Sequence, residues 1–276
     1  MAMPTMKAPV KLAAFGAVLA AVFGIAFLTG TQSAALLAPP VIHGNELGGL
    51  TASVDGYTLH AVEPQVDPGE DVFVEFSITG PDGRTAPELA DLDGTHLHVF
   101  AIRRDLTGFQ HVTPDRGPGT SWWPVLNLTP GPWHVIVELQ PKALGREITL
   151  ATDFDVPGDY RAEPLPPPAD ETVIDGLTVR RTGALTTRLG SGTTFMITDD
   201  GEPVTDLQPA HHALGHAVII RPGDLGYRHL HAVPTGASGP RLEFEGGVPE
   251  RGTYRVFVEF YRDEVRHVAA YTVEVP

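Results

Sequence analysis

The chain contains one stretch of sequence twice, and this duplication constrains its fold more than any other feature. One copy reads GTHLHVFAIRRDLTGFQHV from residue 94, and the other reads LGHAVIIRPGDLGYRHLH from residue 214. Twelve residues separate His98 from His111, and twelve also separate His216 from His229. An apolar run, an Asp-Leu pair and a Gly-aromatic pair lie between the histidines in both copies.

The similarity continues on both sides of these blocks. Upstream, residues 74–89 match residues 193–207, and downstream GPWHVIVEL at 131–139 matches GTYRVFVEF at 252–260. A long period that occurs only twice indicates two tandem domains of about a hundred residues, and not a solenoid of small repeats. We expect the first domain over residues 51–157, a Pro-rich linker over 158–170 and the second domain over 171–276.

Each copy shows the pattern of an all-β domain. Short apolar or alternating segments follow one another, and 30 Gly and 26 Pro supply frequent turns between them. No segment beyond the N-terminus has a helical period over a helical length. The pattern predicts two tandem β-sandwich domains of immunoglobulin-like or cupredoxin-like type. Because Pro166–Pro168 favour a stiff extended linker, we expect the two domains to sit apart or to share a small interface.

The N-terminal segment predicts the compartment. Residues 1–11 carry Lys7 and Lys11, and residues 12–38 contain no charged residue. Such a segment is typical of a transmembrane anchor or a signal peptide, with residues 39–50 as a tether. Positive residues before the span place the following domains outside the cytoplasm. We therefore expect a single-pass membrane protein with extracytoplasmic domains, secreted if the segment is cleaved.

Composition limits the partners. The formal net charge of −15 opposes binding to nucleic acid, so none is expected as a partner. The chain has no cysteine, which excludes disulfides, thiolate nucleophiles and blue-copper centres. We also find no sequence motif of a hydrolase, metalloprotease or nucleotide-binding enzyme, and no enzymatic activity is expected.

Histidines are the main candidates for chemistry, because 12 of them occur without any cysteine. In the second copy, His229 and His231 are two residues apart and point to one face of a strand. His216 on the neighbouring strand and His267 on the last strand complete a predicted metal site. Three or four imidazoles suit Cu(II) or Zn(II), and copper is the preferred cofactor.

The first copy offers a poorer site, made of His96, His98 and His111. Thr113 stands where the second copy has His231. His98 and His216 also alternate with apolar residues on their strands, which is the pattern of buried structural histidines. A structural role for these histidines therefore stays open beside the metal site.

The blocks GHAVIIRPGDLGYRHLH and GTYRVFVEFYRDEVRHVAAYTVEV resemble a family of actinobacterial proteins, membrane-anchored or secreted, some of them labelled heavy-metal-binding. The resemblance extends over most of residues 45–276, because DLTGFQHVTP in the first copy is similar to the same motif. It implies an extracytoplasmic β-sandwich that handles copper. Thr113, Ala232 and Val268 depart from the family pattern, and Thr113 weakens the first site.

We therefore expect a membrane-tethered protein that binds copper for delivery or detoxification, with a metal ion and an extracytoplasmic protein as partners. The alternative is a structural or adhesive ectodomain that contacts the cell wall or a membrane partner. In that case the histidines are packing residues, and Trp122 and Trp123 form the contact.

Overall fold

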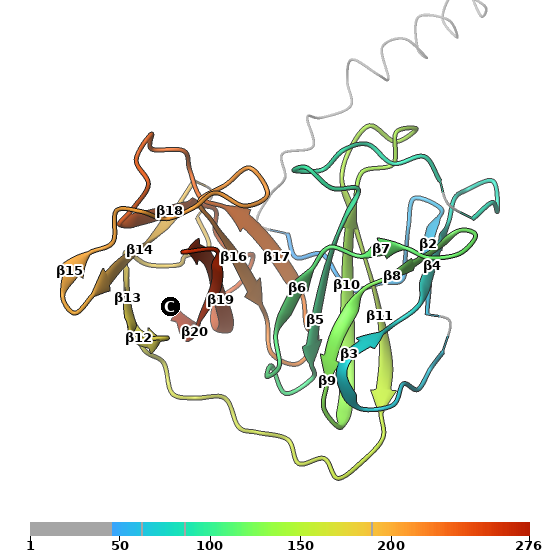
Figure 1. The fold of residues 1–276 in the computed structure, drawn as a ribbon, viewed down its shortest axis with the longest axis horizontal. Coiled ribbons are helices and arrows are strands. Elements are labelled where there is room, and N and C mark those ends of the chain that lie inside the picture. Colours follow the sequence, from blue (N-terminus) through green and yellow to red (C-terminus); the bar gives the residue numbers. More distant parts are fainter. Residues whose placement is uncertain (1–45, 62, 86, 189) are drawn as a thin grey trace, which may run out of the picture. The chain divides into compact units, whose positions relative to one another are not determined.

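The structure is a computed structural model that describes residues 46–61, 63–85, 87–188 and 190–276. The predicted anchor at residues 12–38 lies outside the described residues. Among the described residues, no helix has the length and apolarity needed to span a membrane. Residues Asn45–Pro276 form one compact unit, and every regular element described in it is a β-strand, as the sequence predicts (Figure 1).

The first repeat (residues 51–157) is built from two larger sheets and a short ribbon. The order of strands is β1-β2-β4-β8-β7 in one sheet and β11-β10-β5-β6 in the other, while β3 and β9 form a two-stranded ribbon. The predicted alternation through residues 72–78 is divided, since β3 ends at Phe73 and β4 begins at Phe76 in another sheet. The strands are β1 (Ser53–Val54), β2 (Tyr57–Ala61), β3 (Gly69–Phe73), β4 (Phe76–Thr79), β5 (Leu97–Arg103), β6 (Gln110–Val112), β7 (Asp115–Arg116), β8 (Ser121–Trp123), β9 (Val125–Leu128), β10 (Gly131–Leu139) and β11 (Ile148–Val156).

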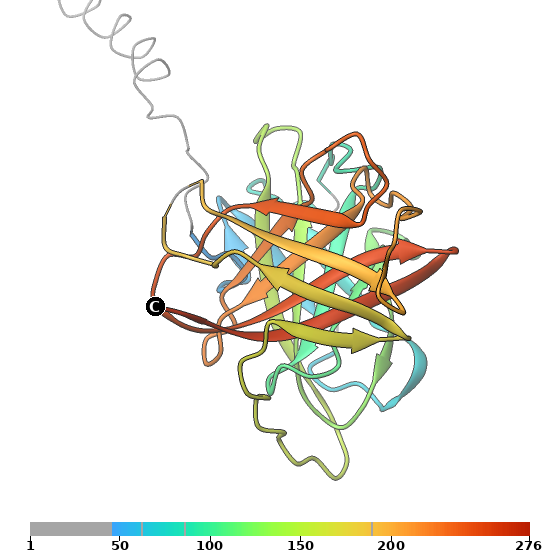
Figure 2. The same ribbon diagram turned by 90° about the vertical axis from the view of Figure 1, so that its left-hand side faces the viewer.

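The second repeat (residues 171–276) has the same plan. One sheet has the order β12-β13-β14-β15 with β18 paired to β14, and the other has the order β17-β16-β19-β20. This topology is that of an immunoglobulin-like sandwich, in which strands A, B and E face strands C′, C, F and G. Figure 2 shows the yellow and orange strands of the first of these sheets nearest the viewer. The strands are β12 (Glu171–Ile174), β13 (Leu177–Thr182), β14 (Gly192–Asp199), β15 (Glu202–Pro203), β16 (Gly215–Ile220), β17 (Tyr227–His231), β18 (Arg241–Glu245), β19 (Gly252–Arg262) and β20 (Val265–Val275).

Tight turns connect many of these strands. Asp55-Gly56 and Asp175-Gly176 join matching hairpins in the two repeats, and all four residues have positive φ between 49° and 85°. An Asp-Gly pair in this conformation forms the two-residue turn whose twist matches that of the flanking strands. The two repeats therefore share local turn chemistry as well as sequence.

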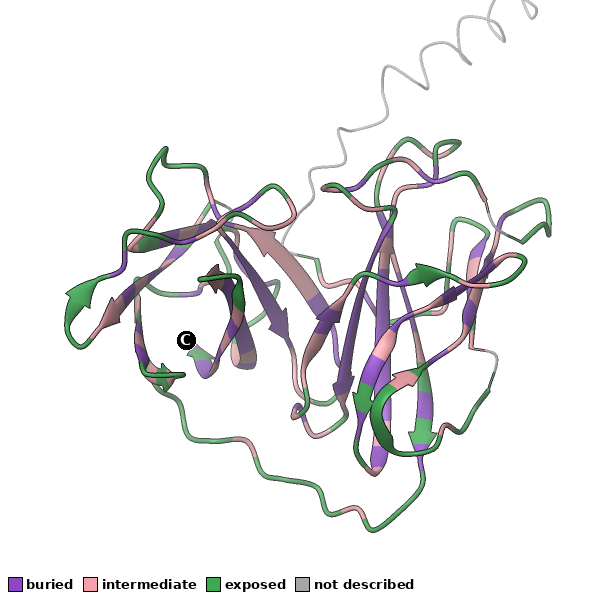
Figure 3. Cartoon of the chain, viewed as in Figure 1, coloured by how far each residue is buried: buried purple, intermediate pink, exposed green. Residues whose placement is uncertain are grey.

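Each repeat has its own apolar core, and a third core lies between them. β5 is buried along both faces, because Leu97 and Val99 contribute to the core of the first repeat while Phe100 and Ile102 contribute to the third. β16 is divided in the same way between its own sandwich and the third core. Figure 3 accordingly shows β5 and β16 mostly in the purple of buried residues.

Of the two expected arrangements, repeats that sit apart or repeats that share an interface, the third core shows the second. The sheets β11-β10-β5-β6 and β17-β16-β19-β20 pack against each other, and the Phe109 ring stacks on Phe257 with 4.3 Å between ring centroids and an interplanar angle of 8°. The predicted tether also takes part, since Gly48 pairs with Tyr227 through two backbone hydrogen bonds of 2.8 and 2.9 Å. The Pro-rich linker joins the repeats without separating them.

Candidate metal centre

Two matching hairpins bring the histidines together. In each repeat a strand leaves a first histidine, turns at the Asp-Leu-Gly-aromatic segment, and returns with a second histidine, as the spacing predicts. The hairpins are β5–β6 with His98 and His111, and β16–β17 with His216 and His229. The aspartates at the turns have local roles, because Asp105 accepts hydrogen bonds from Thr107 and Asp224 accepts one from the Gly226 backbone.

We call His216, His229 and His231 the second histidine group. Their donor nitrogens all lie within 4.8 Å of one another, and His216 Nδ1 is 3.1 Å from His229 Nε2. The register pairs His216 with His231 and places His229 opposite Val218. Directly paired residues of antiparallel strands share a face. The sequence spacing predicts that His216 faces His229, but its direct partner in the sheet is His231.

We call His98, His111 and His211 the first histidine group. Their donor nitrogens also lie within 4.8 Å of one another, and His98 Nδ1 is 3.0 Å from His111 Nε2. His98 and His111 belong to the first repeat, whereas His211 belongs to a turn of the second. Both groups thus contain the same pair of facing nitrogens, one Nδ1 and one Nε2.

A buried carboxylate stands behind each pair, and each comes from the opposite repeat. Glu138 Oε2 on β10 is 2.9 Å from His229 Nδ1, and Glu259 Oε1 on β19 is 3.3 Å from His111 Nδ1. Glu138 and Glu259 occupy the same position in the two copies of the repeat. Within their own sheets they lie opposite His98 and His216, so both carboxylates point across the shared layer.

The hydrogen bonds of the second histidine group determine where its protons are. The Ala210 carbonyl can only accept, so His216 Nε2 donates to it over 2.9 Å and a neutral His216 has its lone pair on Nδ1. His229 Nε2 must then donate to that lone pair. A neutral His229 consequently offers a lone pair to Glu138, which has to be protonated to donate the last hydrogen bond.

The pKa values agree with this distribution of protons. Burial, together with the neighbouring imidazoles, lowers the pKa of His98 from 6.5 to about 2 and that of His216 to about 3. Burial also holds the pKa values of His111 and His229 well below the usual value. In the opposite direction, burial raises the pKa of Glu138 from 4.5 to about 7. The imidazoles are therefore neutral at neutral pH, which is the form that binds metal ions.

The first histidine group differs from the second in one hydrogen bond. His98 is fully buried, and its Nε2 has no hydrogen-bonding partner among the described residues, whereas the matching nitrogen of His216 has the Ala210 carbonyl. A buried polar atom without a partner is costly unless a ligand or water satisfies it. Arg266 adds a positive charge on this side, since its Nη1 donates to the His111 carbonyl over 2.6 Å and lies 3.6 Å from Glu259 Oε2.

Solvent reaches the two groups through one residue of each. The His231 side chain is 36% exposed and His211 is half-buried, whereas the other four imidazoles are buried. Asp93 of the first repeat lies beside the open end of the second group, with 3.5 Å between its Oδ2 and His231 Nε2. His211 and His231 therefore lie on the solvent side of their groups.

Two of the histidines that the sequence proposes do not converge with the others. His267 lies on β20 opposite Phe260, stacks on that ring, and places its Nδ1 2.8 Å from Asp175 Oδ2. It therefore faces the other side of the sheet from His216. His96 precedes β5, is exposed, and contacts the Ala90 carbonyl through Nδ1 at 3.3 Å.

Sequence reasoning missed Glu138, Glu259 and Asp93, and it considered His211 only as a possible ligand of the second copy. Glu138 and Glu259 carry a detectable signal, because a charged residue at the same place in two apolar runs, VIVEL and VFVEF, is unusual. His211 and Asp93 also occupy matching positions in the two copies. Only the packing of one repeat on the other shows which histidines these four residues approach.

The donor sets fit a nitrogen-binding metal ion. A four-coordinate ion with metal–nitrogen distances of about 2.0–2.1 Å holds neighbouring donors about 3.3 Å apart. The facing nitrogens are 3.0 and 3.1 Å apart in the two groups. A carboxylate or carbonyl behind a ligating imidazole fixes its tautomer, and Glu138, Ala210 and Glu259 stand in that position.

Comparisons with known proteins add little to this geometry. A protein family described as a domain of unknown function, DUF8832, matches residues 171–276, which correspond to the second repeat. The comparison with curated proteins gave no match.

Solved structures show a weak likeness. The Escherichia coli adhesin FdeC is 18% identical, with 81% of this chain and 65% of the adhesin chain covered and a TM-score of 0.27. The fibronectin(III)-like modules of Clostridium thermocellum CbhA are 12% identical, with 79% and 94% covered and a TM-score of 0.23. A Salmonella alpha-2-macroglobulin is 14% identical, with 87% and 16% covered and a TM-score of 0.28. TM-scores this low support no inference about function.

Proposed function

We propose that this protein binds a transition-metal ion, copper in preference to zinc, at the second histidine group. The observation that carries the proposal is the pair of fixed imidazoles: His229 is backed by Glu138 and His216 by the Ala210 carbonyl, while their other nitrogens face each other. Purely structural histidines need hydrogen-bonding partners, but they do not need a third imidazole such as His231 at the open end.

The chemistry of the donors selects the ion. Imidazole nitrogens suit Cu(II) and Zn(II), and a given nitrogen site binds Cu(II) more tightly in general. When bound, the ion would be held by His216 Nδ1 and His229 Nε2 together with His231, and Glu138 would accept the remaining His229 proton as a carboxylate. The sequence at residues 1–38 supports an extracytoplasmic role in metal delivery or detoxification, with binding rather than catalysis as the activity.

Metal titration of the full-length protein tests the proposal. Calorimetry with Cu(II) and with Zn(II) should show saturable binding that is tighter for Cu(II). The variant His231→Ala, at a partly exposed position, should weaken binding at this site by about 100-fold or more, since even residues behind the ligands contribute about 10–100-fold. A matched variant, His60→Ala, removes a histidine on β2 that bonds Thr79 outside both groups and should change nothing.

Two results would count against the proposal. Absence of saturable binding in the unmodified chain would refute metal binding outright. Equal losses in His231→Ala and His60→Ala would show that surface histidines bind the metal instead.

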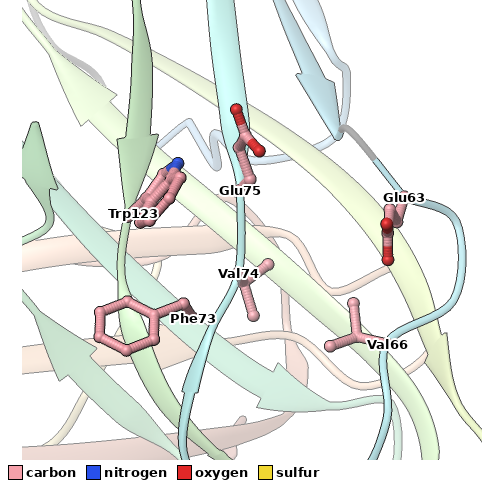
Figure 4. Close-up of a pocket in the computed structure, with 6 residues that line it drawn as sticks. All are labelled: Glu63, Val66, Phe73, Val74, Glu75 and Trp123. Atoms are coloured by element: carbon pink, nitrogen blue, oxygen red, sulfur yellow. The ribbon is translucent and has the colours of Figure 1, made fainter. Parts of the chain in front are cut away.

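A second candidate function rests on a surface hollow in the first repeat. Six residues line a cavity of about 210 Å³. Phe73, Val74 and Glu75 are consecutive, with Trp123 on one side of this segment and Glu63 and Val66 on the other (Figure 4). Phe73 is 62% exposed, and its ring makes an edge contact with Trp123, with 6.0 Å between the ring centroids. Aromatic faces beside carboxylates suit a sugar ring, and immunoglobulin-like sandwiches occur in many cell-surface proteins. We propose glycan contact at this hollow as the alternative role.

Binding to purified cell-wall glycan distinguishes the candidates. Binding that persists in a chelator and is lost in Trp123→Ala would favour the ectodomain role. Trp122 is no part of this surface, because it is buried in the core of the first repeat. If the chelator abolishes glycan binding, that binding depends on the metal centre instead.

A further inference from the structure

The two repeats exchange equivalent residues across their shared layer. His111 of the first repeat meets Glu259 of the second, and His229 of the second meets Glu138 of the first. Each interaction is the copy of the other under the internal duplication, since both histidines and both glutamates occupy matching positions. This reciprocity is the mark of a two-fold interface, in which residue i contacts j and j contacts i.

A second exchange involves the turns that precede β5 and β16. Asp93-Gly94 and His211-His212 close equivalent two-residue turns, and all four residues have positive φ between 46° and 86°. Asp93 reaches His231 in the second group, and His211 reaches His98 in the first, with 4.9 Å between the two rings. Both groups therefore receive a turn residue from the other repeat.

The turn at His211-His212 has a sequence that is energetically unfavourable for its backbone conformation. A turn with positive φ at both central positions favours Asn-Gly or Asp-Gly, which the first repeat has and the second lacks. Two consecutive histidines in the left-handed region cost stability, and such strain clusters at functional sites. Of the pair, His211 turns into the first group while His212 is exposed.

We propose that the chain holds two metal ions, and that His98, His111 and His211 form a second site which is completed across the interface between the repeats. This inference rests on the proposed function. The position of the three imidazoles supports it, because donor nitrogens of His98 and His111 from one repeat and of His211 from the other lie within 4.8 Å of one another.

The charged side chains around the two groups are mainly acidic, which favours cations. Glu138, Glu259 and Asp93 supply three carboxylates, while Arg266 supplies one guanidinium. The imidazoles are neutral ligands, so these carboxylates provide the nearby negative charge. An ion in the first group would join two residues of one repeat to a third residue of the other, and so would hold the repeats together.

Metal stoichiometry of the full-length protein tests the two-site assignment. Native mass spectrometry after loading with Zn(II) should give two ions per chain. His211→Ala and His231→Ala should each leave one ion, and the double variant should leave none. His212→Ala, the neighbouring histidine in the same turn, is the matched control and should retain two ions.

The exchange of glutamates gives a sharper test. In the His211→Ala background only the second site remains, and Glu138→Gln should weaken it by about 10–100-fold. In the His231→Ala background only the first site remains, and Glu259→Gln should weaken it while Glu138→Gln should not. Circular dichroism of each variant checks that it remains folded.

The outcomes separate this inference from the proposed function. No ion in the unmodified chain refutes both. One ion that is lost in His231→Ala and retained in His211→Ala supports the proposed function and overturns the second site. Equal effects of His211→Ala and His212→Ala would also overturn it, because both would then act through the turn alone.

Discussion

Glu138 of the first repeat lies 2.9 Å from His229 of the second, with its Oε2 facing Nδ1 in a layer that both repeats bury. The Ala210 carbonyl at the other end of the chain His216–His229 fixes the direction of the hydrogen bonds. In the metal-free protein Glu138 therefore carries the proton of this hydrogen bond, whereas with a bound ion His229 would carry it and the Glu138 carboxyl would be ionised. The same residue has opposite requirements in the two states.

Glu138→Gln should consequently separate stability from metal affinity. An amide donates to His229 Nδ1 without needing a proton, so at about pH 8 the metal-free variant should gain about 1 kcal/mol in the free energy of unfolding. Urea denaturation with a chelator present measures this change. Glu88→Gln, at a side chain 86% exposed, is the control and should have no effect. Destabilisation by Glu138→Gln at this pH would contradict the deduced protonation.

The buried imidazoles predict acid sensitivity of the metal-free protein. The folded-state pKa of His98 is about 2 and that of His216 about 3, both below the ordinary 6.5. As the pH falls, these histidines therefore take up protons in the unfolded chain before they do so in the folded protein. Their contribution to the free energy of unfolding is complete above pH 6.5. Below that pH it is lost by about 1.4 kcal/mol per pH unit for each such histidine.

The carboxyls oppose this trend only in part. The pKa of Glu138 is raised to about 7, so its contribution is full below 4.5 and declines as the pH rises through 7. The pKa values of His111 and His229 are lowered like those of His98 and His216, and the pKa of Glu259 is raised like that of Glu138. Four histidines therefore favour stability at higher pH, and two glutamates oppose them. Urea midpoints should fall steeply from about pH 7 to about pH 5. A flat profile over this range would show that the imidazoles are not buried as neutral groups.

The sequence predicts much of the fold, because duplication and alternation are local properties. The β5–β6 and β16–β17 hairpins follow from the histidine spacing, and their turns from Asp105 and Asp224. The packing of the repeats is a different matter. Phe100 on β5 and Val218 on β16 alternate with residues that are also apolar, so both faces of each strand are apolar. The sequence of such a strand does not show what covers its second face.

The candidate site shows the same limit. His216, His229 and His231 were predicted as one set from their spacing, and their donor nitrogens do lie together. His267 was predicted with them, but strand parity places it on the opposite face with Asp175. His211 could not be connected with His98 from sequence, since 113 positions separate them in the numbering and only tertiary packing brings them together.

The stacked pair Phe109 and Phe257 predicts that the repeats unfold together. Phe109→Ala removes this contact between the repeats and should cost about 2–3 kcal/mol, because its ring is only partly buried. Phe73→Ala, at an exposed ring of the first repeat, should cost less than about 0.5 kcal/mol. All three tryptophans lie in the first repeat, so their fluorescence reports on that repeat and circular dichroism on both. Coincident urea transitions indicate one cooperative unit, and separate transitions would contradict the shared core.

Adjacent tryptophans on β8 should give opposite results. Trp122 is buried, with the Arg116 guanidinium 4.3 Å from its ring centroid, and Trp122→Ala should cost about 3–5 kcal/mol. Trp123 lines the surface hollow, so Trp123→Ala should cost much less. Thermal unfolding of the two variants compares these effects. Similar losses of stability would show that the hollow is part of the core and would remove it as a binding surface.

Metal removal should destabilise both repeats and not only the one that carries the ligands. A ligand that binds only the folded state at 100 times its Kd adds about 2.7 kcal/mol to the free energy of unfolding. Because Glu138 and His211 each contact a histidine of the other repeat, we expect this stabilisation to extend to both repeats. Adding a chelator to the Zn(II)-loaded protein should lower the unfolding temperature seen by tryptophan fluorescence and by circular dichroism equally. His211→Ala should roughly halve the shift, and His212→Ala should leave it intact. A shift confined to circular dichroism would place the ion within the second repeat alone.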